Sequence, residues 1–174
     1  SVNFEDVGKN LQIRNFDVIH QRISAMNKYK PEDVLSSFSF SVPIQVRFSD
    51  IDGYMHVNNG IYFNYFEHAR AEFLFRVCEW DIFKVGTVVA NINIDYRTPI
   101  HAEDRPDVYV KCTGIGNTSF VLEQVLMGKS KDCGDKIFAQ ASTTMVFVDM
   151  ETMRPVPVPK DYSVKLLGES SKEA

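Results

Sequence analysis

The sequence predicts an α+β domain in which a curled antiparallel sheet wraps around one long, mostly buried helix. Residues 60–79 show a helical pattern that is apolar on most sides and leaves only a narrow stripe of polar residues. The chain that follows, to about residue 150, is patterned as strands separated by turn signals. An antiparallel sheet must cover its apolar face, and one long helix can do so if the sheet curls around it.

The strands are predicted by alternation and by β-branched or aromatic composition. Before the helix, "SFSVPIQVRFS" predicts a strand with one buried face, which carries Val42, Ile44, Val46 and Phe48. Pro43 favours an edge strand or the beginning of a strand. After the helix, four further strands are expected in "TVVANINIDYRTPI", "RPDVYVKCTGIG", "TSFVLEQVLMGK" and "KIFAQASTTMVFVDM". Such a layer leaves open edges, so we expect two chains to pair as a dimer.

Three regions are expected along the chain. Residues 1–39 predict an N-terminal extension with one amphipathic helix in "FDVIHQRISAMNKY"; Pro31 ends this helix or lies just beyond it. Residues 40–150 form the main domain. Residues 151–174 are rich in proline and then polar, which predicts a surface strap and a frayed tail.

Composition excludes several classes of function. The chain has 174 residues, a net charge of −4 and a pI of about 5.6, which argues against nonspecific nucleic-acid binding. No apolar run reaches the roughly 18 residues of a membrane span. The three cysteines, Cys78, Cys112 and Cys133, lack metal-like spacing and are expected to be free thiols in the cytoplasm. The sequence begins with Ser1 rather than Met, so organellar targeting by a removed leader stays open.

A polar cluster in "FSDIDGYMHVNNGIYFNYFEHAR" precedes the helix directly. Asp50, Asp52 and His56 offer three metal ligands, but no second histidine stands at helical spacing and no EF-hand pattern is present, so no metal is expected. A structural interpretation is that Asn58 or Asn59 caps the helix while Asp50 bonds the backbone of the turn.

The same cluster also supports a catalytic interpretation. The first N–H groups of a helix have no partner within the helix, and its dipole adds positive charge there. Around Asn59 and Gly60 these groups would polarise a carbonyl, as in an oxyanion hole. A nearby carboxylate could attack that carbonyl or activate a water, with His56 orienting the site or assisting proton transfer. Capping and acyl transfer both remain open on spacing alone.

The stretch resembles the signature of hotdog-fold acyl-CoA thioesterases of the 4-hydroxybenzoyl-CoA thioesterase type. The match is strong over about residues 44–75 and weaker over roughly 40–150; its motifs are Arg47-Phe48, Asp50-Ile51-Asp52, His56-Val57-Asn58-Asn59 and Glu67-His68-Ala69-Arg70. The resemblance implies a hotdog fold, hydrolysis of a small-molecule acyl thioester, and a homodimer or a dimer of dimers with sites at the subunit boundary. It implies no cofactor, with coenzyme A entering only as part of the substrate.

The resemblance also implies roles for single residues. Asp52 matches the catalytic carboxylate, which acts as nucleophile or general base. Asn59 matches the residue whose backbone N–H polarises the thioester carbonyl, and Tyr62, one turn later, is expected to line the acyl pocket. Thr118 and Ser119 match a strand start that lies near ligand in some relatives. Asn58 is expected to brace the loop or to contact substrate.

The sequence departs from the family pattern at the phosphate-binding position. "GIGNTSF" contains no Arg or Lys, so Arg97, Lys111 or Lys129 would have to bind the phosphates of coenzyme A. The turn also resembles plant acyl-ACP thioesterases, although Tyr54 stands where they carry Asn. An acyl-ACP substrate therefore stays an alternative, as does a hotdog module that binds an acyl chain or a protein without chemistry. The spacing between aspartate and histidine in hotdog hydratases is not met.

Overall fold

The computed structural model of this chain describes residues 29–130 and 134–168. The chain divides into two compact units, residues 1–30 and Pro31–Ala174, and the second unit carries every element described below. The amphipathic helix expected before Pro31 lies outside the described residues and stays a prediction. None of the described helices is long and apolar enough to cross a membrane.

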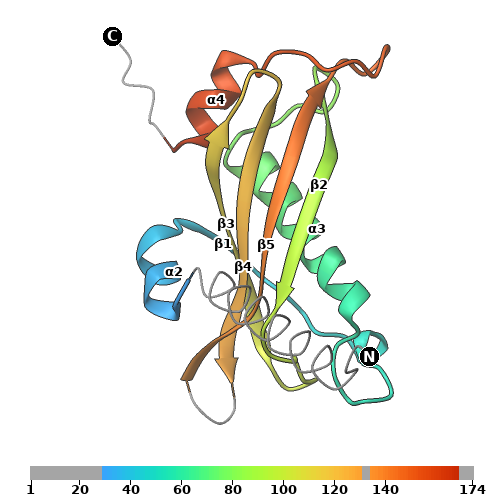
Figure 1. Cartoon of the computed structure of the whole chain (residues 1–174), viewed down its shortest axis with the longest axis vertical. Helices are drawn as coiled ribbons and strands as arrows, with labels where there is room; N and C mark the ends of the chain where they lie inside the picture. Colours follow the sequence, from blue (N-terminus) through green and yellow to red (C-terminus); the bar gives the residue numbers. More distant parts are fainter. Residues whose placement is uncertain (1–28, 131–133, 169–174) are drawn as a thin grey trace, which may run out of the picture. The chain divides into compact units, whose positions relative to one another are not determined.

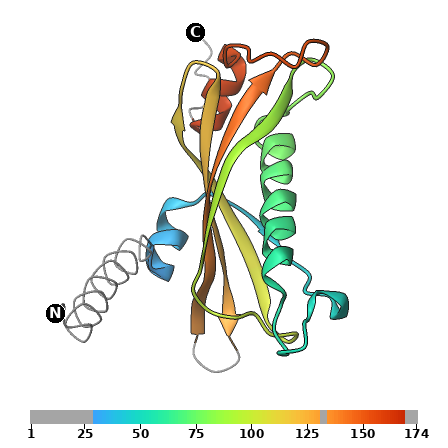
Figure 2. The ribbon, with the colours of Figure 1, turned by 45° about the vertical axis from the view of Figure 1, so that its right-hand side comes forward.

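A five-stranded antiparallel sheet forms the centre of the described chain. Its strands are β1 (Phe40–Pro43), β2 (Gly86–Tyr96), β3 (Arg105–Ile115), β4 (Ser119–Ser130) and β5 (Gly134–Val148), in the order β1-β3-β4-β5-β2. The long helix α3 (Asn59–Arg76) lies along one face of this sheet (Figures 1 and 2). The predicted class is confirmed: one long helix covers one face of a curled antiparallel sheet.

The core lies between α3 and the sheet. Tyr62, Phe66, Ala69 and Phe73 repeat at helical spacing and are almost completely buried. The sheet meets them with alternate side chains, among them Val108, Val110, Phe120, Leu122, Phe138 and Phe147. This burial explains why the sequence around α3 is apolar on its inner side.

One buried polar group ties α3 to the middle of the sheet. Gln124 Nε2 donates to the Phe66 carbonyl oxygen at 2.8 Å, and the Thr143 hydroxyl donates to Gln124 Oε1 at 3.1 Å. Gln124 and Thr143 are both fully buried. Because a buried amide without partners is costly, these bonds favour a single position of the helix on the sheet.

The first strand is shorter than predicted. It ends at Pro43 on the edge of the sheet, and the chain then leaves it for a 3₁₀ turn, η1 (Phe48–Asp50). The expected edge position of Pro43 is confirmed, but the expected burial of Phe48 is wrong because this side chain is 95% exposed. The outer side of α3 is also wider than the predicted narrow stripe, since Phe75 is 46% exposed.

Two short helices were not predicted. Helix α2 (Pro31–Ser37) starts at the proline that was expected to end the preceding helix or to lie just beyond it, and proline is favoured at a first helical position. It lies on the face of the sheet opposite α3, where Phe38 packs edge-to-face on Tyr109 at 6.5 Å (Figure 2). Helix α4 (Lys160–Leu166) occupies part of the expected strap, and its Tyr162 ring stacks on Phe147 at 5.8 Å.

Substituting Gly128 with Ala is expected to destabilise the fold by about 1–3 kcal/mol or more. A Cβ at this position would lie 2.6 Å from the Arg105 carbonyl oxygen and 2.7 Å from Pro106 Cα, so the backbone of β3 would have to move. Gly114→Ala is the matched control, because its Cβ would meet nothing within 4 Å. Chemical denaturation of both variants measures the difference, and equal stabilities would contradict the prediction.

Candidate active site

Asp52 opens a tight loop that ends at His56. The Asp52 N–H donates to the His56 carbonyl at 2.8 Å, and the Met55 N–H donates to the Asp52 carbonyl at 3.0 Å. Met55 has a φ of 64°, a conformation that costs energy in a residue other than glycine. The Asp52 carboxylate accepts the Tyr54 N–H through Oδ1 at 2.8 Å. No described residue donates to Oδ2, so one carboxylate oxygen is available to a ligand.

Asp50, by contrast, is a structural residue. It is 7% exposed, and its Oδ2 accepts the Tyr65 hydroxyl at 2.6 Å and the Arg47 N–H at 2.9 Å. Its carbonyl oxygen accepts the Asn58 N–H at 2.8 Å. The expectation that Asp50 bonds the loop backbone is therefore confirmed. Burial, with the hydrogen bond to Asp50 second, raises the pKa of the Tyr65 hydroxyl, which keeps it a neutral donor.

Tyr65→Phe is expected to lower the free energy of unfolding by about 1–3 kcal/mol, because the buried Asp50 carboxylate loses a donor. The substitution leaves Asp52 unchanged, so a stable folded fraction should keep most of its turnover. Thermal unfolding and steady-state kinetics on the same sample separate these effects. An unchanged Tm would show that the Tyr65–Asp50 bond contributes little.

Asn58 caps helix α3. The sequence had left Asn58 and Asn59 as alternative caps. Its Oδ1 accepts the Gly60 N–H at 2.9 Å, and its carbonyl accepts the Ile61 N–H at 2.9 Å. Gly60 therefore has its N–H occupied, and a Cβ on it would lie 3.3 Å from that Asn58 oxygen. The Asn59 N–H has no hydrogen-bond partner among the described residues. The Asn59 N–H is thus a donor without a partner at the start of the helix. Gly60, which has no Cβ, leaves room for the Asn58 side chain that caps the helix.

Most of the predicted site residues meet in one cavity of about 370 Å³. Its lining consists of Asp52, Tyr54, His56, Val57, Asn58, Asn59, Tyr62 and Pro99. A carboxylate, an imidazole and the free N-terminus of a long helix therefore face the same space. Gly60 is not part of this lining.

The wall of the cavity is held by a segment remote in sequence that we did not predict as part of the site. The Tyr62 hydroxyl accepts the Ile100 N–H at 3.2 Å, and the Val57 N–H donates to the Ile100 carbonyl at 2.9 Å. The Tyr96 hydroxyl donates to the Asn59 carbonyl at 3.0 Å. These bonds fix the chain just after the loop and the start of α3. Only the "NIDYRTPI" pattern signalled this segment, and it predicts a strand rather than a site.

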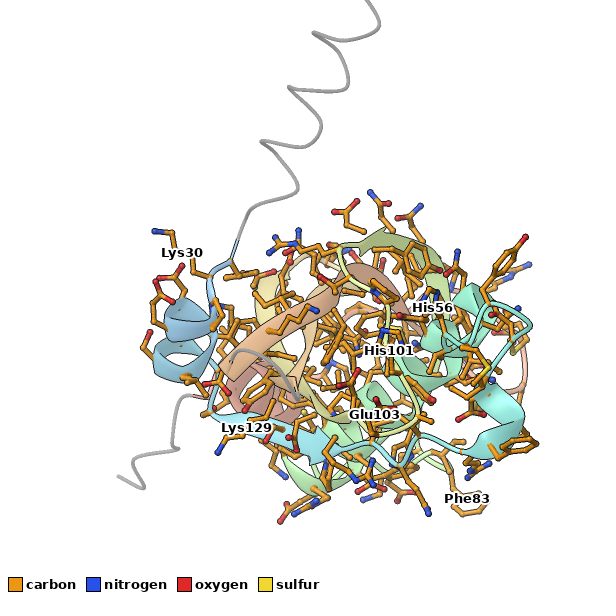
Figure 3. The ribbon with its side chains drawn as sticks, turned by 90° about the horizontal axis from the view of Figure 1, so that it is seen from below. Lys30, His56, Phe83, His101, Glu103 and Lys129 are labelled. Atoms are coloured by element: carbon orange, nitrogen blue, oxygen red, sulfur yellow. The ribbon has the colours of Figure 1, made fainter. Side chains whose placement is uncertain are left out.

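His56 has an aromatic neighbour from the same segment. The His56 and His101 rings lie 4.8 Å apart, edge to face at 78°, and stand side by side in Figure 3. The His101 N–H donates to Asp104 Oδ2 at 2.8 Å, which fixes the backbone that carries this ring. The contact holds the His56 imidazole at the wall of the cavity.

Thr118 and Ser119 lie far from this cavity within one chain. The Phe147 N–H donates to the Thr118 carbonyl at 2.9 Å, and Phe147 is paired with Thr87 at the start of β2. The cavity lies beside Tyr96, the last residue of β2, whose hydroxyl donates to Asn59 in the cavity lining. This end of β2 lies next to the start of α3 (Figure 1). The length of β2, about 30 Å, separates the two places. A single chain does not bring these two predicted residues to Asp52.

The three candidate phosphate ligands have different surroundings. Lys111 Nζ donates to the Ser37 hydroxyl at 3.1 Å and lies 4.3 Å from the Phe38 ring, on the α2 face. Arg97 donates to Gln140 Oε1 at 2.8 Å and is partly buried. Lys129 is exposed and pairs across the sheet with Arg105, at the end of the sheet that holds the cavity.

Outside the cavity, the described residues provide neither a metal site nor a reactive thiol at Cys78. Among the described residues, no group of three or more His, Cys, Asp or Glu side chains could hold a metal ion. Burial raises the pKa of the Cys78 thiol to about 12, so this buried thiol stays protonated and is unreactive.

A family model described as the thioesterase-like superfamily matches residues 46–166 of the chain. The chain belongs to this superfamily. A curated relative is the long-chain acyl-CoA thioesterase FadM of Escherichia coli, which is 29% identical over 71% of this chain and 93% of its own length.

Solved structures support the same family assignment. A thioesterase from Thermus thermophilus, complexed with coenzyme A and Zn, is 29% identical with a TM-score of 0.64 over 75% of this chain and 98% of its own. The 4-hydroxybenzoyl-CoA thioesterase of a Pseudomonas strain shares the fold, with a TM-score of 0.67 over 74% of this chain and 99% of its own at 18% identity. The predicted hotdog fold and thioesterase family are confirmed.

Proposed function

We propose that this thioester hydrolase acts on acyl-CoA, with Asp52 as the catalytic carboxylate and the Asn59 N–H as the donor to the carbonyl oxygen. One observation carries the proposal: the free oxygen of Asp52 and the unbonded N–H at the start of α3 belong to residues that line the same cavity. A helix N-terminus stabilises negative charge, and here α3 is 18 residues long.

The reaction requires the thioester carbonyl to enter between these two groups. Asp52 either attacks the carbonyl carbon or removes a proton from a water that attacks it. The carbon–sulfur bond breaks as the tetrahedral intermediate collapses, and the thiolate takes up a proton, for which His56 is the nearest imidazole on the cavity wall. If Asp52 attacked directly, a water then hydrolyses the acyl-aspartyl anhydride. Both routes yield a carboxylate and the free thiol of the carrier.

The role that we propose for Tyr62 is to shape the acyl side of the cavity. Its ring lies 5.1 Å from that of Tyr96, edge to face. Burial raises the pKa of the Tyr62 hydroxyl, so this group stays neutral and accepts the Ile100 N–H rather than acting as a base. Asn58 keeps the loop in place as the helix cap.

We further propose that the active protein is a homodimer that pairs along β2, or a dimer of such dimers. In the described sheet β2 is an eleven-residue edge strand with a bond partner on one side only, β5. Long open edges are stabilised by pairing. Antiparallel pairing of two copies would bring the partner subunit's Thr118 and the partner's Ser119 to the end of the sheet that holds Asp52. Lys129 is the candidate for the phosphates of coenzyme A, because it is exposed at that end.

A panel of short, long and aromatic acyl-CoA substrates tests the function. Release of free thiol is followed with a thiol reagent, and the preferred acyl group should emerge as the highest kcat/KM. Binding of acyl-CoA without thiol release would instead identify a non-catalytic acyl-binding module. Turnover of acyl-ACP but not acyl-CoA would identify the carrier protein as the substrate. Sedimentation of the same sample gives the oligomeric state.

We place the enzyme in the cytoplasm, where its thiols stay reduced. Cys78 and Cys112 are free in the structure. Fractionation of cells that produce the full-length protein tests this location.

A further inference from the structure

Tyr96 is the last residue of β2 and contacts the first residue of α3. Its hydroxyl donates to the Asn59 carbonyl at 3.0 Å, although the two residues are 37 positions apart in the sequence. Tyr96 pairs with Ala139 of β5, so the hydrogen-bond register of the sheet fixes its backbone. The start of α3 is therefore tied to the end of a strand through this side chain.

The peptide unit that follows Asn59 is held by side chains at both of its polar ends. Its carbonyl oxygen accepts the Tyr96 hydroxyl, and its N–H, which belongs to Gly60, donates to Asn58 Oδ1 at 2.9 Å. Hydrogen bonds that are linked in this way polarise and strengthen one another. The Tyr96 hydroxyl therefore supports both the cap of α3 and the orientation of this peptide unit.

The preceding peptide unit carries the Asn59 N–H, the donor proposed to bind the carbonyl oxygen of the substrate. The Asn58 carbonyl of this unit accepts the Ile61 N–H at 2.9 Å, and the Asn58 N–H donates to the Asp50 carbonyl at 2.8 Å. These two bonds fix Asn58, on the loop side of the donor. The bond from Tyr96 fixes the Asn59 carbonyl, on the helix side of the donor. The Asn59 N–H thus lies between two fixed points.

The Tyr96 ring makes a contact that does not depend on its hydroxyl. The ring lies 5.1 Å from the ring of Tyr62, which lines the cavity, in an edge-to-face arrangement. Phenylalanine at this position would keep that contact. Because Asn59 is exposed, water can bind its carbonyl once the hydroxyl is gone, so the fold should lose little stability.

We propose that Tyr96 is a positioning residue for catalysis, whose hydroxyl keeps the Asn59 N–H oriented toward the thioester carbonyl oxygen. The inference rests on the proposed function, in which that N–H stabilises the oxyanion. Such a donor is effective because it is oriented before the charge develops. A misplacement of about 1 Å can lower the rate by about 10²-fold. Tyr96 is not part of the cavity lining, so it acts through the backbone of Asn59.

Tyr96→Phe is expected to lower kcat by about tenfold and to leave KM within about twofold of the wild type. The loss falls on kcat because the donor stabilises charge that develops only in the transition state. Tyr109→Phe is the matched control, since it removes a tyrosine hydroxyl on the face of the sheet opposite α3 and should change neither constant. A normal kcat for Tyr96→Phe, or a change in KM alone, would overturn the inference.

The double variant Asn59→Pro/Tyr96→Phe tests whether the hydroxyl acts through the Asn59 N–H. Groups that act as a unit show non-additive effects on kcat. Once proline has removed the N–H, loss of the hydroxyl should lower kcat by less than about twofold. A purely structural effect of Tyr96, such as a smaller folded fraction, would lower kcat equally in both backgrounds. An equal loss in both backgrounds would therefore overturn the inference.

The single variants separate this inference from the proposed function. A normal kcat in folded Asn59→Pro would reject the donor and, with it, the role of Tyr96. A reduced kcat in Asn59→Pro, together with a normal kcat in Tyr96→Phe, would reject only the role of Tyr96. Thermal unfolding shows whether each variant is folded. Tyr96→Phe keeps the ring and the backbone, so its own kcat and KM decide the inference even if Asn59→Pro fails to fold.

Discussion

Asp52→Asn is expected to lower kcat for acyl-CoA hydrolysis by about two to four orders of magnitude. The amide keeps the size of the side chain and an oxygen that can still accept the Tyr54 N–H. It can neither attack the carbonyl as an anion nor remove a proton from water. Asp52 is partly buried and makes no buried ion pair among the described residues, so the fold should be unaffected. Initial rates of thiol release, with thermal unfolding on the same sample, measure both effects.

Asp50→Asn is the matched control for this experiment. Asp50 accepts two hydrogen bonds in a buried position, so its substitution should lower Tm more than Asp52→Asn does. Its folded fraction should keep far more turnover, because the catalytic carboxylate is still present. If Asp52→Asn retained near-normal turnover while folded, Asp52 would not be the catalytic carboxylate.

Asn59→Pro is expected to reduce kcat by about 10²- to 10³-fold, which is typical for the loss of one oxyanion donor. Proline has no N–H, so the substitution deletes the Asn59 N–H, which has no partner among the described residues. The position tolerates proline: Asn59 is the first residue of the helix, and Asn58 before it has φ −58° and ψ 137°, an extended conformation that proline favours in its neighbour. The Asn58 cap on Gly60 should persist.

Asn59→Ala separates the backbone from the side chain in this test. It keeps the N–H and removes only the carboxamide, so its kcat should stay close to that of the wild type. A similar kcat for the proline and alanine variants would rule out the Asn59 N–H as the oxyanion donor. A drop in both would assign the role to the side chain instead.

Local patterns were sufficient to predict most of the elements and part of the site. The spacing of Tyr62, Phe66, Ala69 and Phe73 predicts α3 because a helix returns every fourth side chain to the same face. Four strands after the helix follow from alternation. The different roles of the two loop aspartates also follow from short-range rules for turns, since the partners of Asp50 include the nearby Arg47 backbone.

Errors arose where the local sequence is compatible with more than one conformation. Pro43 ends β1 early, and the chain then turns away from the sheet, which leaves Phe48 exposed rather than buried. Helix α4 forms where only a strap was expected; its Tyr162 stacks on Phe147. For α4, packing against another element selects the helix.

The amino-acid sequence was enough to predict the fold class, the family signature and a carboxylate next to a helix start. It could not predict that the Asn58 side chain accepts the Gly60 N–H while the Asn59 N–H has no partner. Either of two adjacent asparagines can cap a helix, so composition does not distinguish them. Nor could it place Ile100 against Val57 and Tyr62, or separate Thr118 from the cavity by the length of β2. Those features depend on strand register and on hydrogen bonds between distant segments, which exist only once the sheet has formed around α3.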